Sequence, residues 1–506
     1  MLRRLIPSLI AVAALAACGS PGVTPTSSGP SSEPQPGGTI TIGIDSEISA
    51  LDPIANQIAG QATLVVANAV YEPLFTDGPA GALEPGLGES LTSDDLRTWT
   101  LVLQEGRTFS DGSPVTAQAV VDHVRRLGDP AAECQCAALA AEISDMAVVD
   151  PRTVTFTLAE PNAGFPRYFT RQLGMIASTT AEATDGSPLG AGPYRFEAAA
   201  AGSSLTVTRS SNYQGPAPHA DTVVFQFLPD PDSRYQSLAS GTVDLAWVDT
   251  PNLIAQAQSE GRTVATANAS TTTAFLNAQV APFDDVRVRQ AVQAAIDREA
   301  LLAVVDQGQG VVANGPILSR SPYASGTQYP AFDPDRARGL LAEVGQPISF
   351  AYTTDSRPQS MQRATAIQQM LADVGITMTI DVVDTATWGT KLYAGDFAAI
   401  EFVTSAYADS DAVMGIFEPE ASGNFGGYMN PEVGALIAQG RGTADQDERK
   451  RLYADAAQKI VDDVPVLFFT ESPAGFVADT SIGGMPDLHD RNVISLPPGQ
   501  LWTTAQ

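Results

Sequence analysis

The chain has 506 residues, a formal net charge of −29 and 44% hydrophobic residues. Its length is sufficient for two or more domains with a large core. Its negative charge argues against binding to nucleic acid, whose phosphates it would repel, and against lying flat on an anionic lipid surface.

The N-terminus has the features of a secretory signal. Two arginines precede an apolar stretch, residues 5–14, that is too short to span a membrane comfortably. The sequence LAAC at residues 15–18 resembles the bacterial lipobox, which implies cleavage before Cys18 and a diacylglycerol on its sulfur. Residues 1–17 are then a signal peptide, and a plain signal peptide that contains a cysteine is the alternative. Residues 18–37, rich in Ser, Pro and Gly, predict a flexible tether.

The first half of the body shows both strand and helix periodicity. Strands alternate apolar residues with a period of two, and helices repeat them every three or four residues. These patterns predict strands at 39–44, 98–103, 152–158 and 222–227, a hairpin at 194–196 and 205–208, and helices at 61–75 and 232–240.

The second half has a regular alternation of strands and helices. We expect helices at 284–305, from Pro334 onward, at 361–374 and around Trp388, and strands at 348–352, 376–382 and 397–403. This order argues for an α/β domain with right-handed crossovers.

The motifs of common enzymes are absent from the sequence. There is no G-x-S-x-G, no S-x-x-K and no Gly-Lys dipeptide, which argues against serine hydrolases, penicillin-recognising enzymes and P-loop proteins. His123, His219 and His489 lie far apart and lack H-x-x-x-H spacing, which argues against a histidine-rich metal centre. We therefore predict a protein that is not an enzyme, with no catalytic residue, no metal and no cofactor.

Cys134 and Cys136 are the only cysteines after Cys18. A Cys-x-Cys pair can close a very small disulfide loop, or the two can remain free thiols, and the sequence leaves both open. Two thiols without a nearby histidine or second cysteine pair make a poor metal site, so we interpret the pair as structural.

Several short motifs follow one another along the body of the chain. They are LDP at 51–53, VYEPL at 70–74, FSDGSPVTA at 109–117, GAGPY at 190–194, and PFDDVRVRQA at 282–291 followed by AIDR at 295–298. In this order, behind a lipobox, they resemble the family 5 solute-binding proteins of ABC importers, which are the dipeptide, oligopeptide and nickel type. The resemblance covers nearly the whole chain after the signal peptide.

The resemblance implies an α/β, two-lobed periplasmic-binding-protein fold of the cluster C type, with a discontinuous larger lobe and a ligand cleft between the lobes. Its expected parts are lobe 1 or domain I (38–62, 186–274 and 471–506), an extra subdomain or domain II (63–185), and lobe 2 or domain III (275–470). Such proteins close around a ligand by hinge motion. The resemblance further implies a monomer, lipid-anchored on the outer face of the cytoplasmic membrane, that delivers its solute to permease and ATPase subunits.

Ligand choice is expected just after the strand predicted at 397–403. There the peptide-binding members carry an aspartate, followed by an aromatic residue, that holds the amino group of the ligand. In this chain Ala406 stands in place of the aspartate and Tyr407 matches the aromatic, with Ser405 before them. Asp409 or Asp411 could take over the amino group, or both could be plain solvated loop residues.

An arginine is expected to select the other end of the solute. Dipeptide-binding members hold the ligand carboxylate with an arginine beside a proline, and Arg357-Pro358 falls at the matching place. A surface arginine in a turn is the alternative. Together, Arg357 and Ala406 predict an anionic solute that lacks a standard peptide amino terminus.

The other candidate ligand-binding residues are mostly aromatic. Trp247, Trp388 and Phe402 are expected on the walls of the cleft, with core packing as the alternative. Asn277 ends one expected interlobe crossing, 273–277, as a hinge residue or a partner of the backbone, and the other crossing is expected at 468–471.

The predicted function is therefore the capture of a peptide or peptide-like solute for an ABC importer. Within this class, a sugar oligomer or a metal chelate is the alternative ligand. A sensory lipoprotein that binds a signal without transporting it is the alternative from another class. A secreted hydrolase would require a nucleophile or metal constellation, which the sequence does not present.

Overall fold

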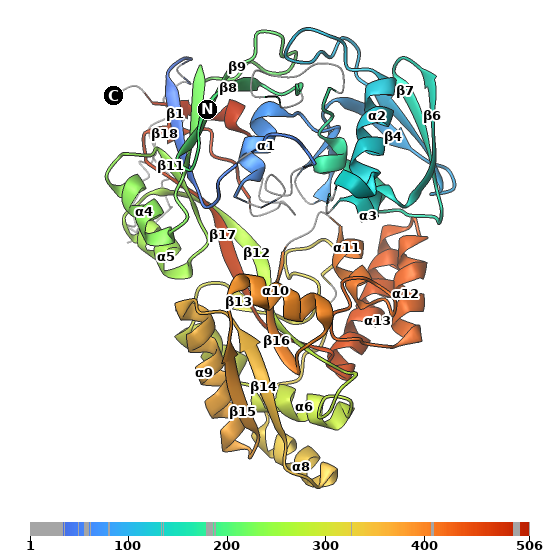
Figure 1. Cartoon of the computed structure of the whole chain (residues 1–506), viewed down its shortest axis with the longest axis vertical. Helices are drawn as coiled ribbons and strands as arrows, with labels where there is room; N and C mark the ends of the chain where they lie inside the picture. The colour runs from blue at the N-terminus through green and yellow to red at the C-terminus, as the bar shows by residue number, and fades with distance from the viewer. Residues whose placement is uncertain are drawn as a thin grey trace, which may run out of the picture. The chain divides into compact units, whose positions relative to one another are not determined.

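One large mixed β-sheet contains most of the strands of the protein (Figure 1). The computed structural model describes residues 34, 36–48, 50–54, 60, 62–78, 81–132, 134, 136–178, 186, 189–324, 326–405, 409–488 and 496–504. The strand order is β15-β14-β16-β12-β17-β11-β1-β10-β9-β8, and β13 pairs with β17. In this order the strands are Thr377–Val382, Ser349–Thr354, Ala399–Ser405, Thr263–Leu276, Val466–Ala478, Leu245–Val248, Thr39–Ile44, Thr222–Phe227, Ser204–Arg209 and Tyr194–Ala200, with β13 at Val311–Val312.

Two long antiparallel strands, β12 and β17, join the two halves of this sheet (Figure 1). Their pairing runs from Thr263 opposite Ala478 to Phe275 opposite Val466. At one end β17 also pairs with β11, and at the other β12 pairs with β16. The expected crossings at 273–277 and 468–471 lie largely on these two strands.

In the lobe 1 half, three neighbouring strands are parallel and the remaining pairs are antiparallel. Strand β1 lies between β10 and β11 and is parallel to both. The helices of this half are α1 (Leu64–Val70), α4 (Pro231–Ala239) and α5 (Pro251–Ser259). Because parallel strands end at the same edge, the residues that follow β1 and β11 are brought close to each other.

The chain between α1 and β8 forms a second, four-stranded sheet in the order β4-β5-β7-β6. Its elements are β4 (Gly88–Thr92), β5 (Thr98–Leu103), β6 (Ile143–Asp150), β7 (Thr153–Leu158), α2 (Ala117–Gly128), α3 (Ala137–Ala140), the pair β2 (Phe75–Asp77) and β3 (Leu83–Pro85), and the 3₁₀ helices η3 (Pro130–Ala132), η4 (Phe165–Thr170) and η5 (Gln172–Gly174). Thr116 caps α2 by accepting a hydrogen bond from the amide of Ala119. A separate hydrophobic core, with Phe165 among the rings of Phe156 and Phe169, fills this region.

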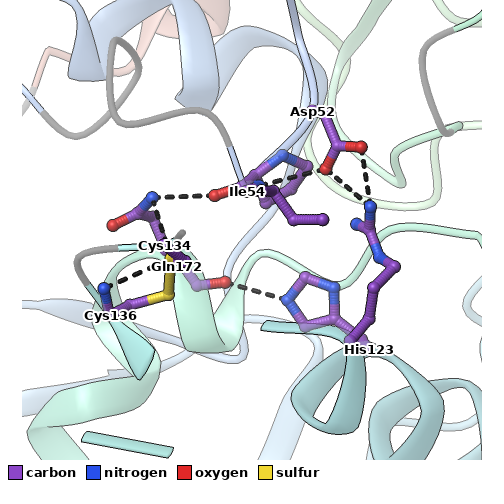
Figure 2. Close-up of a disulfide and its surroundings, with 8 residues drawn as sticks. Asp52, Ile54, His123, Cys134, Cys136 and Gln172 are labelled. Carbon is purple, nitrogen blue, oxygen red and sulfur yellow. Dashed lines mark hydrogen bonds and ion pairs between the residues drawn. A yellow bond between two sulfur atoms is a disulfide. The ribbon is translucent and has the colours of Figure 1, made fainter. Parts of the chain in front are cut away.

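The disulfide between Cys134 and Cys136 lies in this core (Figure 2). Of the two states that the sequence leaves open, a disulfide and two free thiols, the structure has the disulfide. Close by, Gln172 donates from its side chain to the Cys134 sulfur, and its carbonyl oxygen accepts from the ring of His123. His123 is completely buried, and this burial lowers its pKa to about 4.

The lobe 2 half contains the parallel strands β14, β15 and β16 with helices in between. Its helices are α6 (Val286–Ala295), α7 (Arg298–Val304), α8 (Pro334–Val344), α9 (Pro358–Asp373), α10 (Thr385–Ala394), α11 (Ser410–Met414), η6 (Gly415–Phe417), α12 (Pro431–Arg441) and α13 (Gln446–Asp463). The chain then forms β17, the small pair β18 (Ile482–Gly483) and β19 (Trp502–Thr503), and η7 (Pro498–Gln500). The α/β order predicted for this half is confirmed.

Two predicted helices are wrong in extent. The helix expected at 284–305 is two helices, because Ile296 is extended and the Asp297 carboxylate accepts from the amide of Ala300, which starts α7. The helix expected at 61–75 ends at Val70, because the chain turns extended before Pro73, whose ring disfavours a helical residue ahead of it.

An arginine of α6 ties this helix to its surroundings. Arg289 donates to the carbonyl oxygens of Asp463 and Phe283 at 2.8 and 2.6 Å. Over the described part of the chain, none of the helices combines the length and the apolar character that crossing a bilayer requires.

Candidate cleft between the two lobes

A polar cavity of about 230 Å³ lies against the centre of the large sheet. Residues from both lobes and from the two crossing strands line it. They are Asp45, Ala62, Trp247, Asp249, Pro251, Ser270, Thr272, Asp306, Arg357, Gln359, Ser360, Arg363, Glu401, Val403, Ser472, Pro473 and Ala474. This position agrees with the expected cleft between lobes.

Lobe 1 supplies two carboxylates and an indole to this cavity. Asp45 directly follows β1, and Asp249 directly follows β11, on which Trp247 lies. Burial raises the pKa of Asp45. Trp247 is only 3% exposed and packs edge-on against Phe476, and none of the residues that the structure describes accepts a hydrogen bond from its indole nitrogen. It therefore serves both the core and the cavity wall.

Lobe 2 supplies a buried ion pair to the opposite wall. Glu401 on β16 accepts from Arg363 at 2.6 Å, and it also accepts from the hydroxyls of Tyr352 and Thr354 at 3.1 and 3.3 Å. Because all these contacts come from the protein itself, Glu401 is fixed in place and Arg363 is largely neutralised. Sequence reasoning missed this pair.

Arg357 lies at the junction of the cavity with a second one of about 520 Å³. It follows β14 and precedes α9, as predicted, and its side chain is 70% exposed. Asp355 accepts from the guanidinium at 2.6 Å, and this contact raises the pKa of Arg357. The guanidinium is therefore charged, oriented and accessible to a solute.

The second cavity carries the two remaining aromatic candidates. Trp388 on α10 stacks on Phe402 with 5.9 Å between ring centroids, and its indole nitrogen donates to the carbonyl oxygen of Glu401. Both rings are half-buried and both line the cavity. Arg357, Glu401 and Val403 line both cavities, so the two spaces are adjacent parts of one cleft.

The other predicted site residues lie elsewhere or cannot be placed. Asn277 is buried and donates to the carbonyl oxygens of Gly395 and Phe397, so it is a partner of the backbone. Ser405 ends β16, opposite Ser270 of β12. Ala406 and Tyr407 lie outside the described residues.

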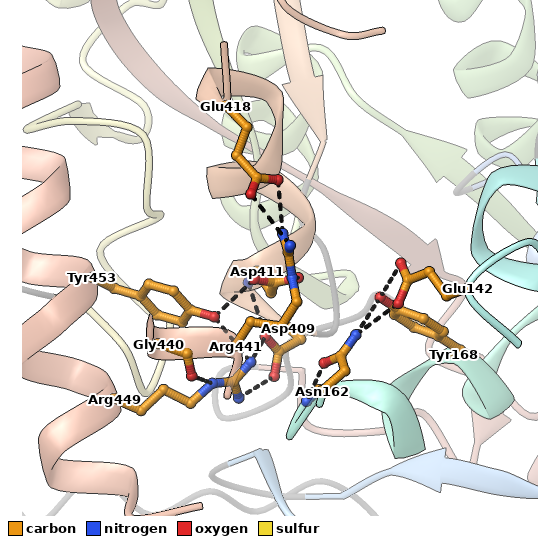
Figure 3. A network of polar contacts seen from close by, with 11 residues as sticks. Glu142, Asn162, Tyr168, Asp409, Asp411, Glu418, Gly440, Arg441, Arg449 and Tyr453 are labelled. Atoms are coloured by element: carbon orange, nitrogen blue, oxygen red, sulfur yellow. Dashed lines mark hydrogen bonds and ion pairs between the residues drawn. The ribbon is translucent and has the colours of Figure 1, made fainter. Parts of the chain in front are cut away.

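Asp409 makes contacts different from those expected of an amine-binding residue. Its two carboxylate oxygens accept from Arg449 at 2.7 and 2.8 Å, and both side chains are at most 5% exposed (Figure 3). Next to it, Arg441 pairs with Asp411 and Glu418. These carboxylates belong to a structural network and not to the lining of the cleft.

The same network joins lobe 2 to the four-stranded region. The amide of Ala163 donates to the carbonyl oxygen of Arg441 at 2.8 Å. On the side of Ala163, Asn162 and Tyr168 both donate to Glu142 (Figure 3). Hydrogen bonds therefore connect segments that are far apart in the sequence.

The cleft residues that sequence reasoning missed are mainly acids. The first cavity is lined by four acids, Asp45, Asp249, Asp306 and Glu401, against two arginines, Arg357 and Arg363. For Asp45 the sequence contains a signal, because it directly follows the strand predicted at 39–44, whereas the strand before Asp249 was not predicted and its parallel pairing with β1 comes from the structure alone. Among the residues that the structure describes, no cluster of three or more His, Cys, Asp or Glu is arranged to hold a metal ion.

Comparisons with known proteins agree with this architecture. The sequence model of the bacterial extracellular solute-binding proteins, family 5 Middle, matches residues 82–424. The glutathione-binding protein GsiB of Escherichia coli O1:K1 / APEC is 29% identical over 448 residues, which cover 83% of this chain and 86% of that protein.

Solved structures show the same fold. NikA from Brucella suis, in complex with Fe(III)-EDTA, has a TM-score of 0.81 at 23% identity, over 92% of this chain and 100% of NikA. The periplasmic binding protein DppA from Helicobacter pylori, in complex with the peptide STSA, has a TM-score of 0.80 at 20% identity, over 93% of this chain and 99% of DppA. The chain belongs to family 5 of the bacterial extracellular solute-binding proteins, which serve ABC transporters.

Proposed function

We propose that the protein captures a peptide or peptide-like solute in the cleft and that Arg357 holds a carboxylate of this solute. The observation that carries the proposal is the placement of Arg357 at the junction of both cavities, exposed and oriented by Asp355. An arginine presents parallel N–H groups that fit a carboxylate in a bidentate manner. The names of GsiB and of the DppA–peptide complex support a peptide-like ligand.

Arg357 favours a carboxylate on the solute, whereas the acids that line the first cavity disfavour a solute with a net negative charge. Four acids and two arginines line the first cavity, and one of these arginines is held by Glu401. A solute with excess negative charge would meet repulsion from the remaining acids. We therefore propose a solute that has a carboxylate but no net negative charge.

We further propose that the protein acts outside the cytoplasm as a monomer anchored by a lipid on Cys18. The Ser-, Pro- and Gly-rich composition of residues 18–37 supports this proposal, because such a sequence suits a tether between a membrane and a folded body. Hinge closure about β12 and β17 would enclose the solute, which is then passed to permease and ATPase subunits.

Calorimetric titration of the purified protein tests the ligand class. The three probes are trialanine, maltotriose and Fe(III)-EDTA, which represent peptides, sugar oligomers and metal chelates. We expect heat of binding with trialanine and none with the other two. Binding of maltotriose or Fe(III)-EDTA without binding of trialanine would contradict the proposal.

A further inference from the structure

Asp45 and Asp249 are presented together on the lobe 1 wall of the cleft. Each follows the last residue of its strand, β1 or β11, and both line the first cavity. The two strands are adjacent and parallel, with Ile42 opposite Leu245. Carboxyl ends of parallel strands are where ligands bind in open α/β sheets, so these acids occupy a position from which a solute can be contacted.

The surrounding protein does not fully neutralise this pair of acids. The only hydrogen bond to the Asp45 side chain among the described residues comes from the hydroxyl of Ser46, at 2.8 Å. Asp249 pairs with Arg234 at 3.3 Å, but that guanidinium also donates to three backbone carbonyl oxygens. Burial raises the pKa of Asp45, the Ser46 hydroxyl and the charge of Arg234 lower it, and the charge of Asp249 raises it by a smaller amount, so that the net change is a rise. The two carboxylates thus repel each other in a partly buried place.

A third carboxylate on the same cavity is only weakly paired. Asp306 is 2% exposed, and none of the described residues makes a hydrogen bond of ordinary length and angle to its Oδ2. Burial raises the pKa of Asp306, and the nearby Thr470 hydroxyl and the charge of Arg363 offset this only in part. Its ion pair with Arg363 is long, at 3.9 Å, because Arg363 is bound to Glu401 at 2.6 Å. A buried acceptor without a donor is costly, and a donor on a bound solute would remove that cost.

We propose that Asp45, Asp249 and Asp306 form a subsite for a cationic group of the solute, an ammonium or a guanidinium. The inference rests on the proposed function, because it uses the same cavity as Arg357. A solute with its carboxylate at Arg357 and its cation at these acids satisfies the charges of both walls. The cation would then be held by Asp45 and Asp249 of lobe 1 together with Asp306 of lobe 2, in a chain that has Ala406 where the family resemblance leads one to expect an aspartate.

The test compares three peptides that share a carboxylate and differ in their cation. Trialanine carries a free amine, N-acetyl-Ala-Lys-Ala carries an ammonium on its side chain, and N-acetyl-trialanine carries no cation. Affinities are measured by calorimetry for the wild-type protein, for Asp45→Asn, Asp249→Asn and their double variant, and for the control Asp94→Asn. Asp94 is exposed and outside the cleft, and its substitution removes the same charge.

We expect the wild-type protein to bind one of the cationic peptides at least about tenfold more tightly than N-acetyl-trialanine. The double variant should lose this preference while its affinity for N-acetyl-trialanine stays unchanged, which also shows that it is folded. Asp94→Asn should behave as wild type.

Two outcomes separate this inference from the proposed function. Equal binding of the three peptides by the wild-type protein, or a preference that survives in the double variant, would overturn the cationic subsite and leave the peptide function standing. Failure of all three peptides to bind would overturn the proposed function and, with it, the subsite.

Discussion

Arg449 donates hydrogen bonds to both carboxylate oxygens of Asp409, at 2.8 and 2.7 Å, and the pair is buried. Its guanidinium also lies over the rings of Tyr323 and Tyr453, 5.0 and 5.2 Å from their centroids. Asp409 caps the start of α11 and Arg449 lies on α13, so the pair holds these two helices together. The pair is therefore a structural element of lobe 2.

Asp409→Ala should strongly destabilise the protein. The substitution leaves Arg449 as a buried charge without its partner, which typically costs about 3–5 kcal/mol. Urea denaturation of the purified variant measures this loss. Arg451→Ala is the control, because this exposed arginine also lies on α13 and pairs with carboxylates at the surface, and we expect little change. An Asp409→Ala protein as stable as wild type would show that the pair is not structural.

Arg357→Gln should weaken the binding of peptides that end in a carboxylate. Loss of a bidentate charged contact at a partly exposed site predicts a fall in affinity of roughly tenfold or more. Trialanine amide, which has no carboxylate, should bind the variant and the wild-type protein equally well. The matched control is Arg338→Gln, another exposed arginine paired with a nearby aspartate. A similar loss for the carboxylate and the amide would contradict the assignment.

His123 should make the protein less stable in acid. Burial lowers its pKa from 6.5 to about 4, so the folded state prefers the neutral ring that donates to Gln172 and accepts from Ala177. The unfolded chain binds the proton more tightly, so the contribution of His123 is complete above pH 6.5 and is lost as the pH falls toward 4. The shift corresponds to about 3 kcal/mol.

The measurement for His123 is the difference in unfolding free energy between pH 7 and pH 4. His123→Gln removes the titrating group, so this difference should become smaller than in the wild-type protein by the stated amount. Comparing the two proteins cancels the contribution of the carboxylates, which titrate in both. Identical pH dependence in the two proteins would show that His123 does not titrate on unfolding.

Replacing Cys134 and Cys136 together by alanine should cost about 1–2 kcal/mol of stability, because so small a loop restricts the unfolded chain only slightly. The pairing itself is tested by thiol titration of denatured protein in a Cys18→Ala background. That protein should show no free thiol before reduction, and the further substitution Cys134→Ala should expose one. Two free thiols without reductant would contradict the disulfide.

Cys18→Ala should release the protein from membranes. The sulfur of Cys18 is the proposed site of the lipid, and without it the folded body has no proposed membrane contact. Membrane fractionation and labelling with a radioactive fatty acid give the answer, with Ser20→Ala as a control that should stay anchored. Continued lipid labelling of the Cys18→Ala protein would contradict this assignment.

Much of the fold was predictable because its signals are local. Apolar periodicity placed β1, the strands β14, β15 and β16, and the helices α8, α9 and α10, whereas α11, α12 and α13 were not predicted. The errors came where a local pattern competes with a stronger local signal. The apolar spacing over 284–305 continues through Asp297, but the capping bond of that aspartate divides the helix.

The candidate cleft was predictable only in part. Arg357 could be located because it adjoins a strand and a proline, and it does lie at the junction of the two cavities. Asp409 could not be excluded from sequence, since its partner Arg449 lies on a different helix. Asp45 and Asp249 stand far apart in the chain, and nothing local relates one to the other.

By itself, the sequence determined the family, the charge of the protein and many of its strands and helices, because periodicity and motifs are properties of neighbouring residues. Only the tertiary structure decided which acids face the cleft and which are bound by arginines. The reason is physical: the parallel pairing of β1 and β11 and the packing of α11 on α13 depend on contacts between distant segments. Those contacts decide whether a carboxylate lines the cleft or pairs with an arginine inside the protein.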